Sequence, residues 1–145
     1  MARIKIDLPA TFPFSTTIPI RITDLNYAGH VGNDTILSII HDARARFLQY
    51  MGYDELNFGG VGTIMKDVAI EYKAQIYYGD EIVASVAIDE ITKVGFDIFY
   101  KLEKVTAGGI KTNAALAKTG MICYNYDLQK IAPIPANVVE KITSL

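Results

Sequence analysis

The hydrophobic positions of this chain follow two different periods, and the changes between them divide it into elements. In residues 17–23, TIPIRIT, the isoleucines Ile18, Ile20 and Ile22 stand at every second position and share one face. This alternation predicts a half-buried strand. Because Pro19 cannot donate a backbone hydrogen bond, the strand is expected at a sheet edge or on a bulge.

A helical period replaces the alternation from Asn33 to Met51. The predicted buried face consists of Ile36, Ile39, Ile40, Ala43, Phe47 and Met51. The predicted polar face consists of Asp34, Ser38, His41, Asp42, Ala45 and Gln49. Gly32-Asn33-Asp34 predicts the helix start, because an asparagine or aspartate side chain can cap free N–H groups. Gly52 predicts its end.

Alternation returns after Gly62. It predicts strands over about 68–76, 82–88 and 96–102, and a last strand over 113–126. Tyr78-Gly79-Asp80 and Ala107-Gly108-Gly109 are typical of tight turns, so these four strands are expected to be antiparallel. The tail PIPANVVEKI predicts a short helix that begins near Pro135.

The order of elements is one strand, one long helix and four further strands. It predicts a single α+β domain over residues 1–145, in which a five-stranded antiparallel sheet wraps around one long central helix. Edge strands of such a sheet invite pairing with another copy. Val83, Ala87 and Phe99 are expected to leave apolar surface on the outer face of the sheet. We therefore expect at least a two-fold dimer.

Composition narrows the classes of function. The 145 residues are 50% hydrophobic and 21% charged, as in a globular protein, and the net charge of −2 gives no electrostatic footprint for nucleic acid. No segment approaches the ~20 apolar residues of a membrane helix, and the first residues lack the pattern of a signal peptide. The lone Cys123 cannot form an internal disulfide. We expect a soluble cytoplasmic protein without nucleic-acid or membrane partners.

Polar chemistry is concentrated in residues 24–34, DLNYAGHVGND, at the entry to the helix. The helix start would present free N–H groups and the positive end of the helix dipole. A thioester or ester oxygen placed there would be stabilised as it becomes an oxyanion. Asp24 and Asp34 are nearby carboxylates that could activate water or attack directly. Each residue alone is typical of caps and turns, and only their concentration favours a site.

Other catalytic patterns are missing from the sequence. His30 and His41 are poorly spaced for zinc and have no cysteine or HExxH partner, so no metal site is expected. The sequence contains neither a GxSxG elbow nor a phosphate-binding loop. Cys123 is expected to pack within its strand rather than to act as a thiolate.

The pattern D-x-N-x-x-G-H-V-x-N, followed by a helix that contains HDAR-x-RFL, resembles the hotdog-fold acyl-CoA thioesterases of the 4-hydroxybenzoyl-CoA thioesterase-like group. GVGTIMKDVAIEYKAQIYYGDEI and KTGMICYNYDLQKIAPIP are similar to later strands of that family, so the resemblance covers roughly residues 17–140. It implies a hotdog fold, a homodimer or a homotetramer built as a dimer of dimers, and sites at subunit interfaces. It also implies hydrolysis of an acyl-CoA substrate to free acid and CoA, with no metal or organic cofactor.

One residue departs from the family pattern. The second aspartate of D-x-D is the family's usual base or nucleophile, and Asn26 stands at that position. An asparagine takes no proton at neutral pH, although its amide can orient a water. The base is then expected to be Asp34 or Asp24, with Asn26 and His30 polarising or positioning the reactants.

The resemblance assigns further roles. The family's oxyanion donors correspond to the backbone around Gly32 and Asn33. Asp42 matches the acid of the family's E-x-A-R segment, and Thr63 is a candidate that would face the site of the partner subunit. Two other functions stay open, namely a non-catalytic acyl-thioester binding module and a hotdog hydratase or dehydratase. Hydratases usually carry an Asp-His or His-Glu pair on one segment, which this sequence lacks, and a carboxylate at the helix start favours an enzyme over a binding module.

Overall fold

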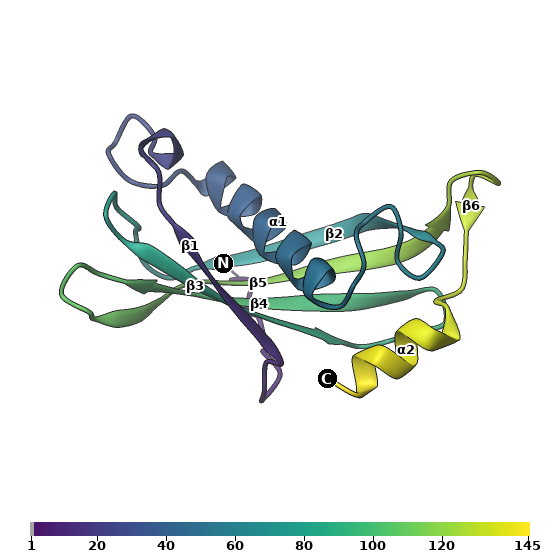
Figure 1. Cartoon of the computed structure of the whole chain (residues 1–145). Coiled ribbons are helices and arrows are strands. Elements are labelled where there is room, and N and C mark those ends of the chain that lie inside the picture. The colour runs from purple at the N-terminus through teal and green to yellow at the C-terminus, as the bar shows by residue number, and fades with distance from the viewer. Residues whose placement is uncertain (1) are drawn as a thin grey trace.

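The computed structural model describes residues 2–145, in which an antiparallel sheet wraps around one long helix (Figure 1). The strands are β1 (Phe14–Pro19), β2 (Gly62–Tyr72), β3 (Glu81–Asp89), β4 (Gly95–Val105), β5 (Lys111–Asn125) and β6 (Lys130–Ile131). The helices are α1 (Asn33–Tyr50), α2 (Ala136–Thr143) and the short 3-10 helix η1 (Ile22–Asp24). The sheet has six strands in the order β1-β3-β4-β5-β2, with β6 paired to β5. This confirms the predicted α+β hotdog architecture.

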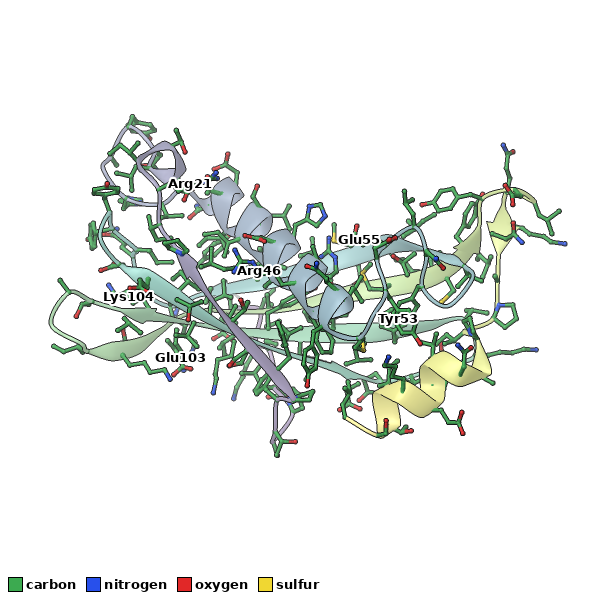
Figure 2. The ribbon with its side chains drawn as sticks, viewed as in Figure 1. Arg21, Arg46, Tyr53, Glu55, Glu103 and Lys104 are labelled. Carbon is green, nitrogen blue, oxygen red and sulfur yellow. The ribbon has the colours of Figure 1, made fainter. Side chains whose placement is uncertain are left out.

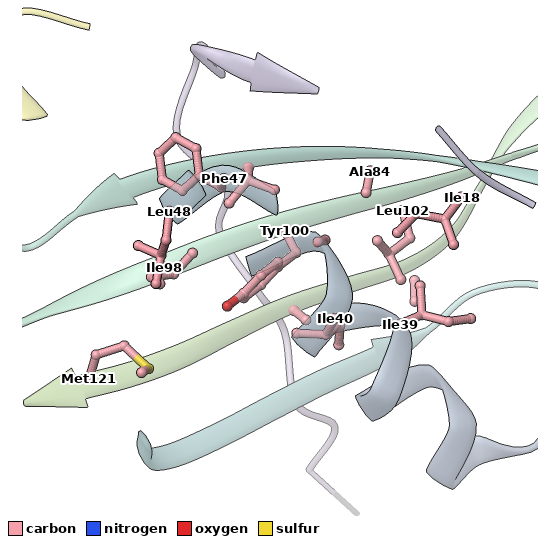
Figure 3. Packing of buried hydrophobic residues seen from close by; sticks show 14 of the residues in the cluster. Ile18, Ile39, Ile40, Phe47, Leu48, Ala84, Ile98, Tyr100, Leu102 and Met121 are labelled. Atoms are coloured by element: carbon pink, nitrogen blue, oxygen red, sulfur yellow. The ribbon is translucent and has the colours of Figure 1, made fainter. Parts of the chain in front are cut away.

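Helix α1 lies across the concave face of the sheet and fills it with apolar side chains (Figure 3). The predicted buried face of the helix is confirmed, and Met51 directly after the helix is buried too. Ile40 and Phe47 pack into one cluster with Ile98 and Leu102 of the sheet. Arg44 is also buried, which makes the buried face wider than the apolar period alone predicts.

The first strand ends earlier than predicted. Ile18 and Ile20 are buried as expected, but Ile22 is 65% exposed because the chain has already turned into η1. The Asp24 carboxylate closes this turn by accepting the backbone N–H of Arg21 at 2.8 Å. The position of β1 at a sheet edge, expected from the proline in it, is confirmed.

Strand β2 is the opposite edge of the sheet, and it ends at Tyr72 rather than near residue 76. The N–H groups of Lys73 and Ala74 both point to the carbonyl oxygen of Ala114, so the ladder stops there. The pairing with β5 also shifts between Met65 and Asp67, which marks a β-bulge.

The outer face of the sheet is partly covered by the first residues of the chain, which run behind the sheet in Figure 1. The N–H of Ile6 donates to Glu71 of β2 at 3.1 Å, and Lys101 of β4 lies 5.2 Å from the centre of the Phe12 ring. Ala87 is only 4% exposed. The expectation of open apolar surface at Ala87 is therefore wrong, because the chain covers it itself. Val83 and Phe99, named with it, are half-buried.

The C-terminal helix α2 follows Pro135, as predicted, and packs on the sheet through Val138 and Ile142. Within residues 2–145, no helix is both long enough and apolar enough to cross a membrane.

Candidate functional site

The turn before α1 holds Asn26 in a fixed orientation. Its side-chain oxygen accepts the backbone N–H of Ala28 at 2.9 Å, and the backbone N–H of Asn26 donates to the carbonyl oxygen of His30 at 2.8 Å. Gly29 has a φ of +81°, a conformation that favours glycine. The side-chain oxygen is held by Ala28, whereas the amide NH₂ has no acceptor among residues 2–145 and is free to donate to another molecule.

The start of α1 has no side-chain cap, contrary to the prediction from Asn33 and Asp34. The N-cap residue is Gly32, whose carbonyl oxygen accepts the N–H groups of Thr35 at 3.1 Å and Ile36 at 3.2 Å. Among residues 2–145, the N–H groups of Asn33 and Asp34 have no hydrogen-bond acceptor. Two donors at the positive end of the helix are thus free to bind an anionic oxygen.

Asp34 and Asn26 come together beside Gly32. A Cβ atom added to Gly32 would lie 2.6 Å from Oδ1 of Asp34 and 3.6 Å from Cβ of Asn26. The missing side chain therefore leaves the space that the carboxylate occupies. A carboxylate, an amide and two free N–H groups share one corner of the molecule.

A cavity of about 250 Å³ opens beside this helix start. Its apolar wall includes Val31, Ile36 and Ile76, and its polar residues include His30 and Asn33. The His30 ring is half-buried, and its Nδ1 lies 3.2 Å from the carbonyl oxygen of Val31. Of the predicted site residues, His30 and Asn33 thus line this cavity.

Tyr72 is a site residue that the sequence did not indicate. It lines the same cavity from the end of β2, and its hydroxyl donates to the carbonyl oxygen of Asn33 at 3.0 Å. Partial burial, and then the negative charge of Asp34, raise the pKa of the phenol. Tyr72 lies at the end of β2, and only the folded sheet brings it to the helix start.

Asp24 lies apart from this group. Its Oδ2 accepts the backbone N–H of Arg21 at 2.8 Å, its Oδ1 accepts the Arg21 guanidinium at 3.2 Å, and the residue is 7% exposed. It lines a second cavity, together with Ser38 and Asp42, and different residues line the first. Both Asp24 oxygens already have partners in the turn that ends β1.

Asp42 serves as a partner of Arg46 on the β1 side of α1. Nε of Arg46 donates to the Asp42 carboxylate at 3.0 Å, and Nη1 donates to the Thr16 hydroxyl at 3.1 Å and to the carbonyl oxygen of Thr17 at 3.0 Å. Figure 2 shows Arg46 on this side of the helix, beside β1. These bonds fasten the helix to the edge of the sheet.

Thr63 lies at the start of β2, whereas Tyr72 lies at its end. Its hydroxyl donates to the carbonyl oxygen of Glu55 at 3.0 Å within its own chain. The Glu55 carboxylate in turn accepts Arg44 at 2.6 Å and lies 3.4 Å from Nε2 of His41. A histidine and a glutamate from two different segments thus lie in contact. The sequence did not predict this contact, because only pairs within one segment were considered.

The Arg44 guanidinium is buried, and it continues this network into the core. It donates to the Tyr100 hydroxyl at 3.3 Å, which shares a hydrogen bond of 2.8 Å with Thr119. A buried charge is costly unless it is paired and hydrogen-bonded, and these partners allow the Arg44 guanidinium to lie between the helix and the sheet. Within the described part of the chain, no three histidine, cysteine or acidic side chains are grouped to hold a metal ion.

Comparisons with known proteins give one family. The sequence profile of the thioesterase-like superfamily matches residues 20–142. No curated protein sequence matches the chain.

Solved structures of similar fold come from several bacteria. One is the 4-hydroxybenzoyl-CoA thioesterase of Pseudomonas sp. strain CBS-3, with 17% identity, a TM-score of 0.80, and coverage of 90% of this chain and 99% of that one. A 1,4-dihydroxy-2-naphthoyl-CoA thioesterase from Synechocystis has 22% identity and a TM-score of 0.78, over 91% of this chain and 96% of its own. A Thermus thermophilus thioesterase complexed with coenzyme A and Zn has 23% identity and a TM-score of 0.78, over 94% and 96%.

Proposed function

The chain belongs to the thioesterase-like superfamily, and from this we propose that it hydrolyses an acyl-CoA thioester to the free acid and CoA. The observation that carries the proposal is the uncapped helix start, where two free N–H groups adjoin a carboxylate and a cavity. Of the three solved structures described above, two are named for CoA thioesters and the third was solved with coenzyme A.

In the proposed reaction, the thioester carbonyl oxygen binds to the N–H groups of Asn33 and Asp34. The Asp34 carboxylate takes a proton from a water, whose oxygen attacks the carbonyl carbon. The negative charge that develops on the carbonyl oxygen is stabilised by the two N–H groups, as in other oxyanion holes. Collapse of the tetrahedral intermediate breaks the C–S bond, and the CoA thiolate leaves and takes up a proton.

Asp34 is the better candidate for the base than Asp24. The Asp34 carboxylate lies at the exposed helix start, whereas both oxygens of Asp24 are bonded to Arg21 in a different cavity. We assign to the NH₂ of Asn26 the role of a donor to the attacking water or to the thioester oxygen. His30 lines the cavity beside the helix start, which is the proposed acyl site.

The experiment is a panel of short, medium, long and aromatic acyl-CoA substrates, with the released thiol measured. We expect hydrolysis by the natural chain and a loss of ~10²–10⁴-fold in Asp34→Asn, which removes the base but keeps the backbone N–H. Asp42→Asn is the matched control on the same helix, and its rate should stay within a few-fold of the natural chain.

The other outcomes separate the alternatives. Binding of acyl-CoA without thiol release would show a binding module. Full activity in Asp34→Asn would exclude Asp34 as the base. The pair of His41 and Glu55 gives little support to a hydratase, because the Glu55 carboxylate is already held by Arg44 at 2.6 Å.

We also propose that the active unit is a cytoplasmic homodimer joined along the β2 edge. This edge strand carries exposed apolar side chains on its inner face, among them Met65 and Val68, and Leu37 of α1 lines one hollow with Met65. An unpaired edge with an apolar strip beside it suits a second copy of the same strand. Antiparallel pairing of the two β2 strands would carry Thr63 toward the partner's helix start. Pairing of two such dimers stays a prediction.

A further inference from the structure

We propose that Tyr72 is a positioning residue that orients and strengthens the oxyanion-binding N–H of Asp34 through a single peptide group. This inference rests on the proposed function. It concerns the hydroxyl that reaches from the end of the edge strand β2 to the first turn of α1, where it donates to the carbonyl oxygen of Asn33 at 3.0 Å.

The carbonyl of Asn33 and the N–H of Asp34 are the two ends of one planar peptide unit. Within α1 this oxygen also accepts the N–H four residues further along the helix. The Tyr72 hydroxyl adds a second hydrogen bond, which further restrains the plane of the unit and with it the direction of the N–H. The same bond draws electron density toward the oxygen and makes the N–H a stronger donor, since hydrogen bonds in a chain polarise one another.

The strengthened N–H of Asp34 remains available to a substrate, because it has no acceptor among residues 2–145. Elsewhere in a helix, the strengthened N–H would serve another carbonyl of the same helix. Asp34 is the second residue of an uncapped helix, so its N–H is left for the thioester oxygen of the proposed reaction. Tyr72 therefore acts on the reaction without touching the reacting atoms.

The contact is also secure against loss of the phenol proton. Partial burial and the Asp34 charge both raise the pKa of the phenol, so the hydroxyl keeps the proton that it donates. On its own strand, the neighbouring charges of Glu71 and Lys73 are paired with each other at 2.9 Å.

Tyr72→Phe removes the hydroxyl and leaves the ring in the cavity wall. Tyr72 is 50% exposed, so the variant should fold, which a thermal melt would check. Tyr77→Phe is the matched control, because its hydroxyl donates to the Gln75 side chain at 2.6 Å and not to the helix.

The first measurement is the ¹H–¹⁵N spectrum of the full-length labelled protein. We expect the Asp34 amide proton to move upfield in Tyr72→Phe and to stay in place in Tyr77→Phe. An unchanged Asp34 resonance in Tyr72→Phe would overturn the inference, whether or not the protein is a thioesterase.

The second measurement is steady-state hydrolysis of the best substrate of the panel. Tyr72→Phe should lower kcat about 3- to 10-fold with KM within twofold, since a strengthened donor is worth only part of a whole oxyanion donor. A raised KM with unchanged kcat would show a binding wall instead, and would also overturn the inference. If the natural chain releases no thiol, the proposed function fails while the amide shift still decides the role of Tyr72.

Discussion

Gly32 shapes the helix start through the side chain that it lacks. The side-chain oxygen of a serine or aspartate at this N-cap would accept a hydrogen bond from one of the first N–H groups and so occupy that donor. Glycine leaves both the donors and the space for the Asp34 carboxylate, whose Oδ1 lies 2.6 Å from where a Cβ would stand. Single positions of this kind decide whether a helix start is merely capped or is open to a ligand.

Cys123 shows the opposite case, a reactive group placed where it cannot react. It is fully buried in β5, and burial raises the pKa of its thiol to about 11. The thiolate is the reactive form, so we expect iodoacetamide at pH 8 to leave the native protein unmodified over hours. The same reagent in urea should add one group per chain, as measured by mass spectrometry. Rapid labelling of the folded protein would contradict this burial.

At the scale of the element, α1 is held differently on its two flanks. Toward β1, Arg46 donates to Thr16 and to the backbone of Thr17. Toward the loop after the helix, the buried Arg44 pairs with Glu55. These hydrogen bonds hold the helix, and hence its N-terminal donors, in one position over the sheet, which the proposed oxyanion site requires.

The N-terminal segment is the second element whose role is visible only in the fold. Deletion of residues 2–11 should uncover the outer face around Ala87 and remove the contact between Ile6 and Glu71. Loss of a few apolar contacts, worth ~1–2 kcal/mol, should lower the Tm by roughly 2–8 °C, as measured by circular dichroism. Deletion of residues 2–5 is the control, since all four of these residues are exposed. Equal melting of the long deletion and the natural chain would show that the segment adds no stability.

At the scale of the whole molecule, the two edges of the sheet differ. The β1 edge is short, carries Pro19 and is bonded to Arg46. The β2 edge is longer and has an apolar strip, with Val68 39% exposed. Only the second edge suits pairing with another copy.

Val68→Lys should therefore convert the dimer to a monomer, because it places two like charges near each other across the proposed axis. Light scattering after size-exclusion chromatography measures the mass directly. Thr17→Lys, at the other edge, should leave the dimer intact. A natural chain that elutes as a monomer, or a Val68→Lys chain that stays dimeric, would refute the β2 interface.

Periodicity predicted the order of the elements and the buried face of α1, because both follow from the backbone period alone. It placed the end of β1 wrongly, since Ile22 continues the alternation by chance while the Asp24 side chain closes the turn. Asn26 and Asp34 were found together because they lie in one turn. Tyr72 was missed because only the pairing of β2 with β5 brings it to the helix start.

Asn26 maintains its turn through one oxygen atom, which accepts the N–H of Ala28. An aspartate side chain offers the same acceptor in the same place. Folding therefore does not discriminate between the amide of this chain and the carboxylate of the D-x-D pattern. Selection for a proton-accepting side chain at this position is therefore uncoupled from selection for the turn itself.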